Sequence, residues 1–394
     1  MQCIRLTRVL GLVAALALGS ATIALACNVP VFRFALERWR PDPYRFVLYH
    51  RGPLSAADLE TIRPLEEQQD KALANVVLRA IDVAELDKPA AEGDEQSALD
   101  RRLFAALGEV SLPRLAVHYP EHLRIDQPVW SGAPGREAIA SLLDSPVRQE
   151  LIKRLAEGQT AVWLLLEPAA GGAASATLLE TELNKLEQEL KLPELTSAPE
   201  DTLLVNTPLK VDFSLLRVRR DDPAEQELVA MLIHSEPDLA ERSDAMVFPI
   251  FGRGRALLAL IGAGITAKNI HDTASFLVSA CSCEVKELNP GFDLLLAADW
   301  EKRLSADGVP IAAPAAAAAP AGPPVLVPIP TGAAQATVSS PTPVVEHPVI
   351  GVTFLNIRAW LIAGGSLLAA LILVGAIVVF AQFRASSNLD DRAR

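Results

Sequence analysis

The chain has 394 residues, which is enough for two or three ordinary domains. Half of the residues are hydrophobic (50%), and the formal net charge is −12. Such an acidic surface repels phosphate backbones, so the composition argues against nucleic acid as a partner.

Residues 1–26 have the pattern of a secretory signal peptide. Arg5 and Arg8 precede an apolar run, and Ala24-Leu25-Ala26 matches a small-residue cleavage site. Cleavage there would place the following domains outside the cytoplasm. Because the next residue is Cys27, a lipoprotein signal with Cys27 as the lipidated residue is the alternative interpretation.

Between residues 27 and 150, apolar periodicity predicts helices alternating with short strands. Pro41 and Pro43 separate the first helix from the first strand, and Ser55 is a predicted N-cap. The helices are expected over 31–39, 55–69, 98–107 and 136–143, and the strands over 46–49, 75–83, 111–119 and 128–132.

The same order recurs between residues 151 and 304, which predicts tandem domains. Gly252-Arg253-Gly254-Arg255 is expected to form the tip of a hairpin, with both arginines exposed. The helices are expected over 176–190, 224–235 and 267–280, and the strands over 161–166, 210–218, 246–251 and 256–261.

This order of elements resembles the thioredoxin fold. Arg51-Gly52-Pro53-Leu54 stands where that family has Cys-Gly-Pro-Cys, and Leu112-Pro113 where it has a cis-proline. In the second region Phe248-Pro249 stands in the place of Leu112-Pro113. The expected fold class is therefore α/β, with two thioredoxin-like three-layer domains over residues 27–150 and 151–304.

The resemblance implies a binding role rather than redox catalysis. Arg51 and Leu54 replace the two redox cysteines, and no cysteine lies near Leu166-Glu167-Pro168 in the second domain. Cysteine-free domains of this family are generally used for protein or peptide binding at the cis-proline face. By this resemblance the binding residues are Arg51, Gly52, Pro53, Pro113 and Pro249.

The C-terminal part predicts a tether and a membrane anchor. Residues 305–353 are rich in proline and alanine, which favours a disordered linker. Residues 359–383 carry no charge, and about 20 apolar residues span a bilayer, so 354–384 are a predicted transmembrane helix that contacts lipid. Residues 385–394 would form a cytoplasmic tail, which gives a single-pass cell-membrane protein.

Three cysteines follow the signal sequence, an odd number that allows no complete disulfide framework. Cys281 and Cys283 are either structural cysteines or a strained redox pair. A metal site using Cys27, Cys281, Cys283 and His271 is the weakest alternative, and neither a metal nor a cofactor is expected.

Two histidines, His118 and His122, are expected to be partly solvated structural residues. The leading hypothesis is a membrane-anchored, extracytoplasmic binding or scaffold protein without enzymatic activity, accessory to an envelope protein partner whose identity is unknown. The alternatives are an envelope thiol-disulfide oxidoreductase that uses Cys281 and Cys283, and a thiol-ligated metal carrier.

Overall fold

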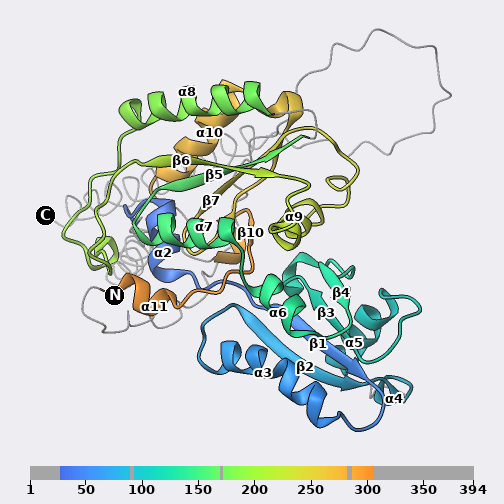
Figure 1. Cartoon of the computed structure of the whole chain (residues 1–394). Coiled ribbons are helices and arrows are strands. Elements are labelled where there is room, and N and C mark those ends of the chain that lie inside the picture. Colours follow the sequence, from blue (N-terminus) through green and yellow to red (C-terminus); the bar gives the residue numbers. More distant parts are fainter. Residues whose placement is uncertain (1–26, 89–92, 169–171, 282–285, 306–394) are drawn as a thin grey trace, which may run out of the picture. The chain divides into compact units, whose positions relative to one another are not determined.

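The computed structural model describes residues 27–88, 93–168, 172–281 and 286–305 (Figure 1). All of them belong to one compact unit, Met1–Gln335. The predicted signal peptide, linker, transmembrane helix and tail lie outside the described residues.

The first sheet has four strands in the order β2-β1-β3-β4. Strand β2 runs parallel to β1, whereas β3 is antiparallel to β1 and β4 is antiparallel to β3. The strands are β1 Tyr44–His50, β2 Val76–Asp82, β3 Arg114–His118 and β4 Trp130–Gly132. The helices of this repeat are α3 Ala56–Asp70, α4 Val83–Leu86, α5 Glu95–Ala105, the 3₁₀ turn η1 Glu121–Leu123 and α6 Arg136–Leu143.

Alternate residues of β1 point to opposite faces of this sheet, as strand geometry requires. Phe46 and Leu48 pack in a cluster that includes Leu65 of α3. Val47 and Tyr49 pack on the other face, where the Tyr49 ring lies 4.9 Å from that of Phe104 in α5. Helices therefore cover both faces of the first sheet.

The second sheet is built around β5, in the order β10-β8-β7-β5-β6, with β9 also paired to β7. Its strands are β5 Ala161–Glu167, β6 Phe213–Arg219, β7 Met246–Phe251, β8 Arg255–Ala256, β9 Leu260–Ile261 and β10 Phe292–Asp293. The associated helices are α7 Pro146–Ala156, α8 Ala173–Glu189, α9 Gln226–Ile233, α10 Ala267–Val278 and α11 Trp300–Leu304. Short 3₁₀ turns are η2 Pro199–Asp201, η3 Gly262–Gly264 and η4 Lys286–Leu288.

The two sheets share one arrangement, with β6-β5-β7-β8 corresponding to β2-β1-β3-β4. In each, the first strand is central, its parallel neighbour follows the crossover helix, and the third strand is antiparallel. The predicted α/β class is confirmed. The single strand predicted over 256–261 is wrong, because β8 pairs with one half of β7 and β9 with the other.

Helix α2 (Val31–Arg38), which precedes the first sheet in the chain, packs against α10 and β7. Phe32 and Ala35 are buried in the cluster of the second sheet. A Cβ added at Gly252, whose φ is +59°, would lie 2.7 Å from the Ala35 Cβ, so glycine permits this close approach. Helix α2 is thus part of the helical layer that packs on the second sheet.

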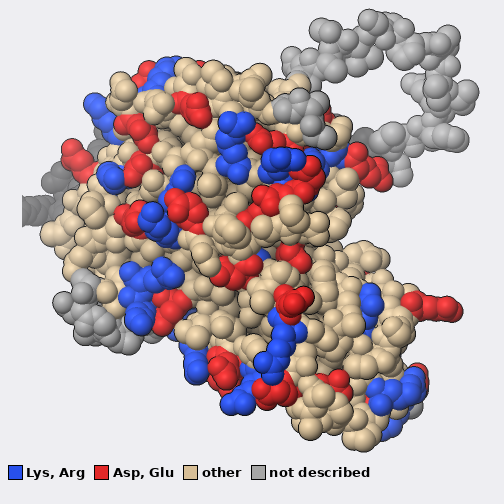
Figure 2. Space-filling view, viewed as in Figure 1, with Lys and Arg blue, Asp and Glu red and all other residues tan. Residues whose placement is uncertain are grey.

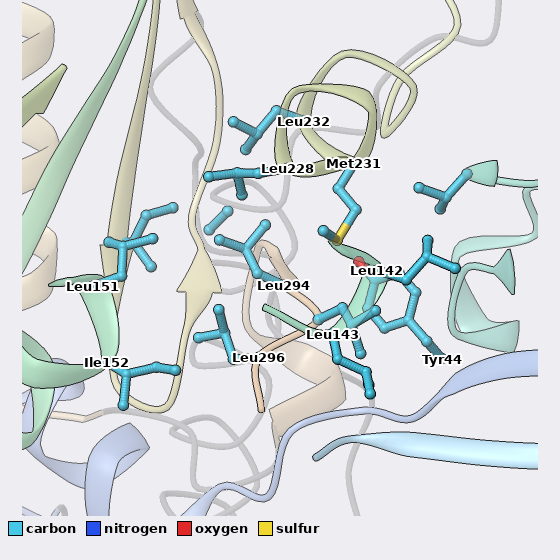
Figure 3. Close-up of a cluster of buried hydrophobic side chains, with 14 of the residues drawn as sticks. Tyr44, Leu142, Leu143, Leu151, Ile152, Leu228, Met231, Leu232, Leu294 and Leu296 are labelled. Atoms are coloured by element: carbon cyan, nitrogen blue, oxygen red, sulfur yellow. The ribbon is translucent and has the colours of Figure 1, made fainter. Parts of the chain in front are cut away.

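The two repeats share a hydrophobic core. Figure 3 shows part of it, with the labelled side chains Tyr44, Leu142, Leu143, Leu151, Ile152, Leu228, Met231, Leu232, Leu294 and Leu296. Two tyrosines of the first repeat also donate to backbone carbonyls of the second, Tyr44 to Asp293 (2.9 Å) and Tyr119 to Met231 (2.7 Å). Apolar packing and buried hydrogen bonds therefore join the repeats.

The exposed arginines expected at the β7–β8 hairpin are buried instead. Arg253 is 7% exposed and donates to Leu36 O (2.8 Å), and its guanidinium also lies 2.8 Å from Glu301 Oε1. Arg255 is 4% exposed and lies 3.3 Å from Asp293 Oδ1. The prediction failed because the partners come from segments distant in the sequence.

The buried cation Lys286 bridges two carboxylates. Its Nζ lies 2.9 Å from Asp42 Oδ1 and also contacts Asp293. Burial raises the pKa of Asp293, but the charges of Lys286 and Arg255 outweigh that effect and lower it overall. Burial, and then the neighbouring charge of Asp293, raise the pKa of Asp42. We call Asp42, Arg255, Lys286 and Asp293 the charge cluster.

Candidate binding face at the end of strand β1

The predicted binding residues of the first repeat form the turn between β1 and α3. Arg51 and Pro53 are exposed, and Gly52 is half-buried. Gly52 has a φ of +71°, in the left-handed region that glycine adopts without strain. The turn is therefore accessible, and its conformation at position 52 would be strained for any residue other than glycine.

Asp82, the last residue of β2, holds this turn in place. Its carboxylate accepts hydrogen bonds from the N–H of Gly52 (3.0 Å) and of Ala84 (3.0 Å). The bond from Ala84 is the largest influence on the pKa of Asp82, and with the bond from Gly52 and the charges of His50 and Arg51 it keeps that pKa below its ordinary value. The carboxyl group is thus an anion that orders the backbone.

His50 also holds this turn. Its Nδ1 lies 2.7 Å from Gly52 O and donates a hydrogen bond there when Nδ1 carries the proton. Sequence reasoning missed both His50 and Asp82. A signal was present, because Asp82 ends a strand parallel to β1, and the carboxyl ends of parallel strands meet at one edge of a sheet.

Ser55 is the N-cap of α3, as predicted. The N–H of Asp58 donates to Ser55 Oγ (3.1 Å), and the N–H of Ser55 donates to Asp58 Oδ2 (3.0 Å). This reciprocal capping box fixes where the helix begins. It also fixes the exit of the chain from the Arg51-Gly52-Pro53 turn.

Pro113 lies beside the same turn. It is exposed, its peptide bond to Leu112 is cis, and the next residue, Arg114, pairs with Tyr49 of β1. Arg114 Nη2 donates to Ser131 O (2.9 Å), which ties β3 to β4. The structure therefore brings together four of the five predicted binding residues. We call Arg51, Gly52, Pro53 and Pro113 the β1-end face.

Two neighbours of this face were not identified from the sequence. Arg114 Nε is buried and has no hydrogen-bond partner among the described residues. The Trp130 ring lies over Gly132, where an added Cβ would approach it to 2.5 Å. No sequence signal distinguished either residue, because both acquire their position through the pairing of β3 with β4.

Pro249, the fifth predicted residue, is not part of an equivalent face. It pairs with Trp163 in the middle of β7 and is buried. Matching the two registers strand by strand places Ala245, which is 7% exposed, where the first repeat has Pro113. The match of Phe248-Pro249 to Leu112-Pro113 was therefore wrong by four residues.

The two cysteines of the described residues, Cys27 and Cys281, lie in the cluster of the second sheet, away from the β1-end face. Cys27 is 2% exposed and its Sγ donates to Glu200 O (3.3 Å). A diacylglyceryl group on this sulfur would have to displace its buried surroundings. Cys281 is also 2% exposed, while Cys283 lies outside the described residues.

The three histidines named in the sequence analysis differ in their exposure to solvent. His118 is 1% exposed, so the expectation of partial solvation was wrong for it, whereas His122 lies 3.7 Å from Asp42 and stays exposed. His271 is exposed on α10. Across the described part of the chain, no three His, Cys, Asp or Glu residues gather as metal ligands.

On the visible side of the molecule, acidic and basic side chains are interspersed rather than gathered by sign (Figure 2). Within the described ranges, no helix has both the length and the apolar character needed to cross a membrane. No protein-family model, curated protein or solved structure matches this chain.

Proposed function

We propose that this chain is a membrane-anchored, extracytoplasmic binding protein whose two repeats are thioredoxin-like domains without redox activity. The first repeat binds a protein or peptide of the cell envelope at the β1-end face. Residues 354–384 anchor the chain, and the linker 305–353 holds the folded part away from the membrane.

The observation that carries this proposal is the accessible turn at the end of β1. Arg51 and Pro53 are exposed there beside exposed Pro113, at the place where a thioredoxin-like domain has its reactive dithiol. Leu54 is half-buried and packs against the shared core. Neither Arg51 nor Leu54 has the sulfur that dithiol exchange requires, so an ordered surface without redox groups remains.

The order of the strands supports the thioredoxin-like interpretation. A central first strand, a parallel second strand and an antiparallel hairpin occur in both sheets, with helices on both faces of the first. Burial of Cys281 weighs against the oxidoreductase alternative, because a thiol must be accessible to attack a substrate disulfide.

Photo-crosslinking in cells that produce the full chain tests the proposal. A photoreactive benzoylphenylalanine replaces Pro53, and in a matched control it replaces Arg63, which is exposed on α3 about two turns further along. We expect a discrete crosslinked product at position 53 that is absent at position 63 and is lost when Arg51→Glu is added.

The same product at both positions, or none at position 53, would contradict binding at the β1-end face. Protease treatment of intact and permeabilised cells checks the location, because the folded part should be cleaved without permeabilising the inner membrane. Reduction of a model disulfide by the purified chain that is lost in Cys281→Ser would establish the oxidoreductase instead.

A further inference from the structure

The chain just before α2 lies against the chain just after α10. A single antiparallel bridge and two backbone hydrogen bonds join them: Pro30 with Ala280, Val31 N–H with Ser279 O (3.0 Å), and Cys281 N–H with Val29 O (3.0 Å). The N-terminal segment is thereby attached to the end of a helix more than 200 residues away in the sequence.

This contact brings two cysteines to one place. Cys281 lies opposite Val29, and Cys27 is two residues before Val29. Both cysteine side chains are 2% exposed and belong to the same buried cluster, together with Val29 and Val278. They are the cysteines of the described residues, and both enter the core of the second repeat.

We propose that Cys27 and Cys281 form a disulfide bond in the mature protein. The proposal rests on the extracytoplasmic location given above, because disulfides form and persist in oxidising compartments. The bond would replace the weak S–H hydrogen bond from Cys27 to Glu200 O. It would close a covalent link between the N-terminal segment and the end of α10.

Cys27 is a diagonal neighbour of Cys281 across this contact, since Val29 is the residue that Cys281 opposes. Such neighbours lie about 7–8 Å apart in a straight antiparallel pair, at the upper limit of the Cα separation that a disulfide bridges. The chain bends at Val29, and closing the bond requires Cys27 and Cys281 to approach each other at this bend. The neighbouring Asn28 is held on the same side by Asp201, which accepts from its backbone N–H (2.6 Å) and its side chain (2.9 Å).

The bond forms by thiol-disulfide exchange with a disulfide-bonded oxidant, such as an oxidised protein dithiol or oxidised glutathione. One cysteine, as its thiolate, attacks a sulfur of the oxidant and releases the other sulfur as a thiolate. The second cysteine then attacks the mixed disulfide. Two electrons pass to the oxidant, and the two protons lost by the protein's thiols end on the oxidant's two sulfurs.

This pairing assigns both cysteines. Cys27 would carry no lipid, because its sulfur would be in the disulfide, so membrane attachment would depend on residues 354–384 alone. Cys281 would not be available as half of a redox pair with Cys283. Cys27 and Cys281 thus receive a structural role, in place of the lipidation of Cys27 and the redox function of Cys281 that the sequence left open.

Peptide mapping under non-reducing conditions tests the bond. The full chain is purified from membranes after free thiols are blocked with N-ethylmaleimide, and it is digested with trypsin. We expect the peptide of residues 27–33 to be linked to that of residues 269–286, with one alkylated thiol on the latter. Reduction before digestion should separate the two peptides.

Serine variants assign the bond. Cys283→Ser should keep the link, whereas Cys27→Ser and Cys281→Ser should lose it and lower the non-reducing melting temperature to that of the reduced wild type. A link that survives Cys281→Ser, an alkylated Cys27, or a lipid mass on Cys27 would overturn the proposal.

A second arm separates this proposal from the proposed function. The reduced, detergent-solubilised chain is incubated with a glutathione redox buffer. If the bond forms in this buffer but not in cells, the pairing is correct and the extracytoplasmic location fails. If it forms in neither, the pairing fails whatever the location.

Discussion

The two repeats have the same strand order but differ in the segments that pack around their sheets. In the first, the turn after β1 is exposed at Arg51 and Pro53. In the second, the residue in the place of Pro113 is buried Ala245, and α2 and β10 add to the layers around the sheet. The same topology therefore supplies an accessible face in one repeat and an anchor for distant segments in the other.

A second difference lies inside the paired strands. The first repeat pairs Arg45 with His118, and matched registers show that the second pairs Val162 with Ile250 at the same place. The first repeat thus has a buried titratable side chain, His118, where the second has the aliphatic side chain of Ile250. We infer that His118 gives the first repeat an acid sensitivity that this position of the second repeat lacks, and the predictions below extend this comparison from the largest expected effect to the smallest.

Removing one of the two cations of the charge cluster should have the largest effect. Lys286→Met leaves Asp42 and Asp293 with one buried cation fewer, and breaking a buried ion pair costs about 3–5 kcal/mol. Urea unfolding of the solubilised chain measures the loss. Lys71→Met, on an exposed side chain, is the control and should change stability by less than about 0.5 kcal/mol. Equal effects of the two variants would show that the buried ion pairs of Lys286 contribute no more to stability than an exposed one.

Acid should destabilise the first repeat through His118. Burial lowers the pKa of His118 to about 4, below the unfolded value of about 6.5. The folded protein therefore resists protonation, so the His118 contribution is complete above pH 6.5 and is lost as pH falls toward 4. The lost stability reaches about 3 kcal/mol.

Unfolding free energies measured between pH 7 and pH 4 check this expectation. His118→Ile, which copies the second repeat, should flatten the profile, whereas His122→Gln on the exposed neighbour should not. A profile unchanged by His118→Ile would assign the acid sensitivity to other groups.

Loss of a hydrogen bond between the repeats should have a smaller effect. Tyr119→Phe removes the donor to Met231 O and should cost about 1 kcal/mol. If the shared core makes the repeats unfold together, circular dichroism and tryptophan fluorescence should still report one transition. Two separated transitions in the wild type would contradict this cooperativity.

The N-cap of α3 should have an effect of similar or smaller size. Ser55→Ala removes the side chain that accepts from Asp58 N–H and should cost about 1 kcal/mol, while Ser55→Thr should recover most of it. Thermal unfolding measures both. An unchanged midpoint in Ser55→Ala would show that tertiary packing alone fixes the turn.

The sequence predicted the local elements better than the contacts between them. Helix α6 has its predicted bounds, and α3 begins after its predicted cap, because periodicity and capping are local signals. Helix α7 was missed although Ser145-Pro146 is an N-cap followed by proline at the first helical position. The start of this helix is therefore visible in the sequence itself.

The remaining differences depend on pairing over long distances. Strand β7 is paired with β8 on one half and β9 on the other, which no local pattern reveals. The burial of Arg253 depends on Leu36 and Glu301, both far away in the chain. For the candidate site, the turn residues were identified from the resemblance, whereas Asp82 and His50 required the sheet register.

The described chain ends just after α11, and that position has a mechanical consequence. Trp300 and Leu304 are buried in the core that both repeats share, and Glu301 pairs with Arg253. Tension applied at Ser305 therefore acts first on this buried helix and on its ion pair with Arg253. Pulling α11 away would expose Trp300 and Leu304 to water, so the segment that follows is attached to the core and not to the edge of a sheet.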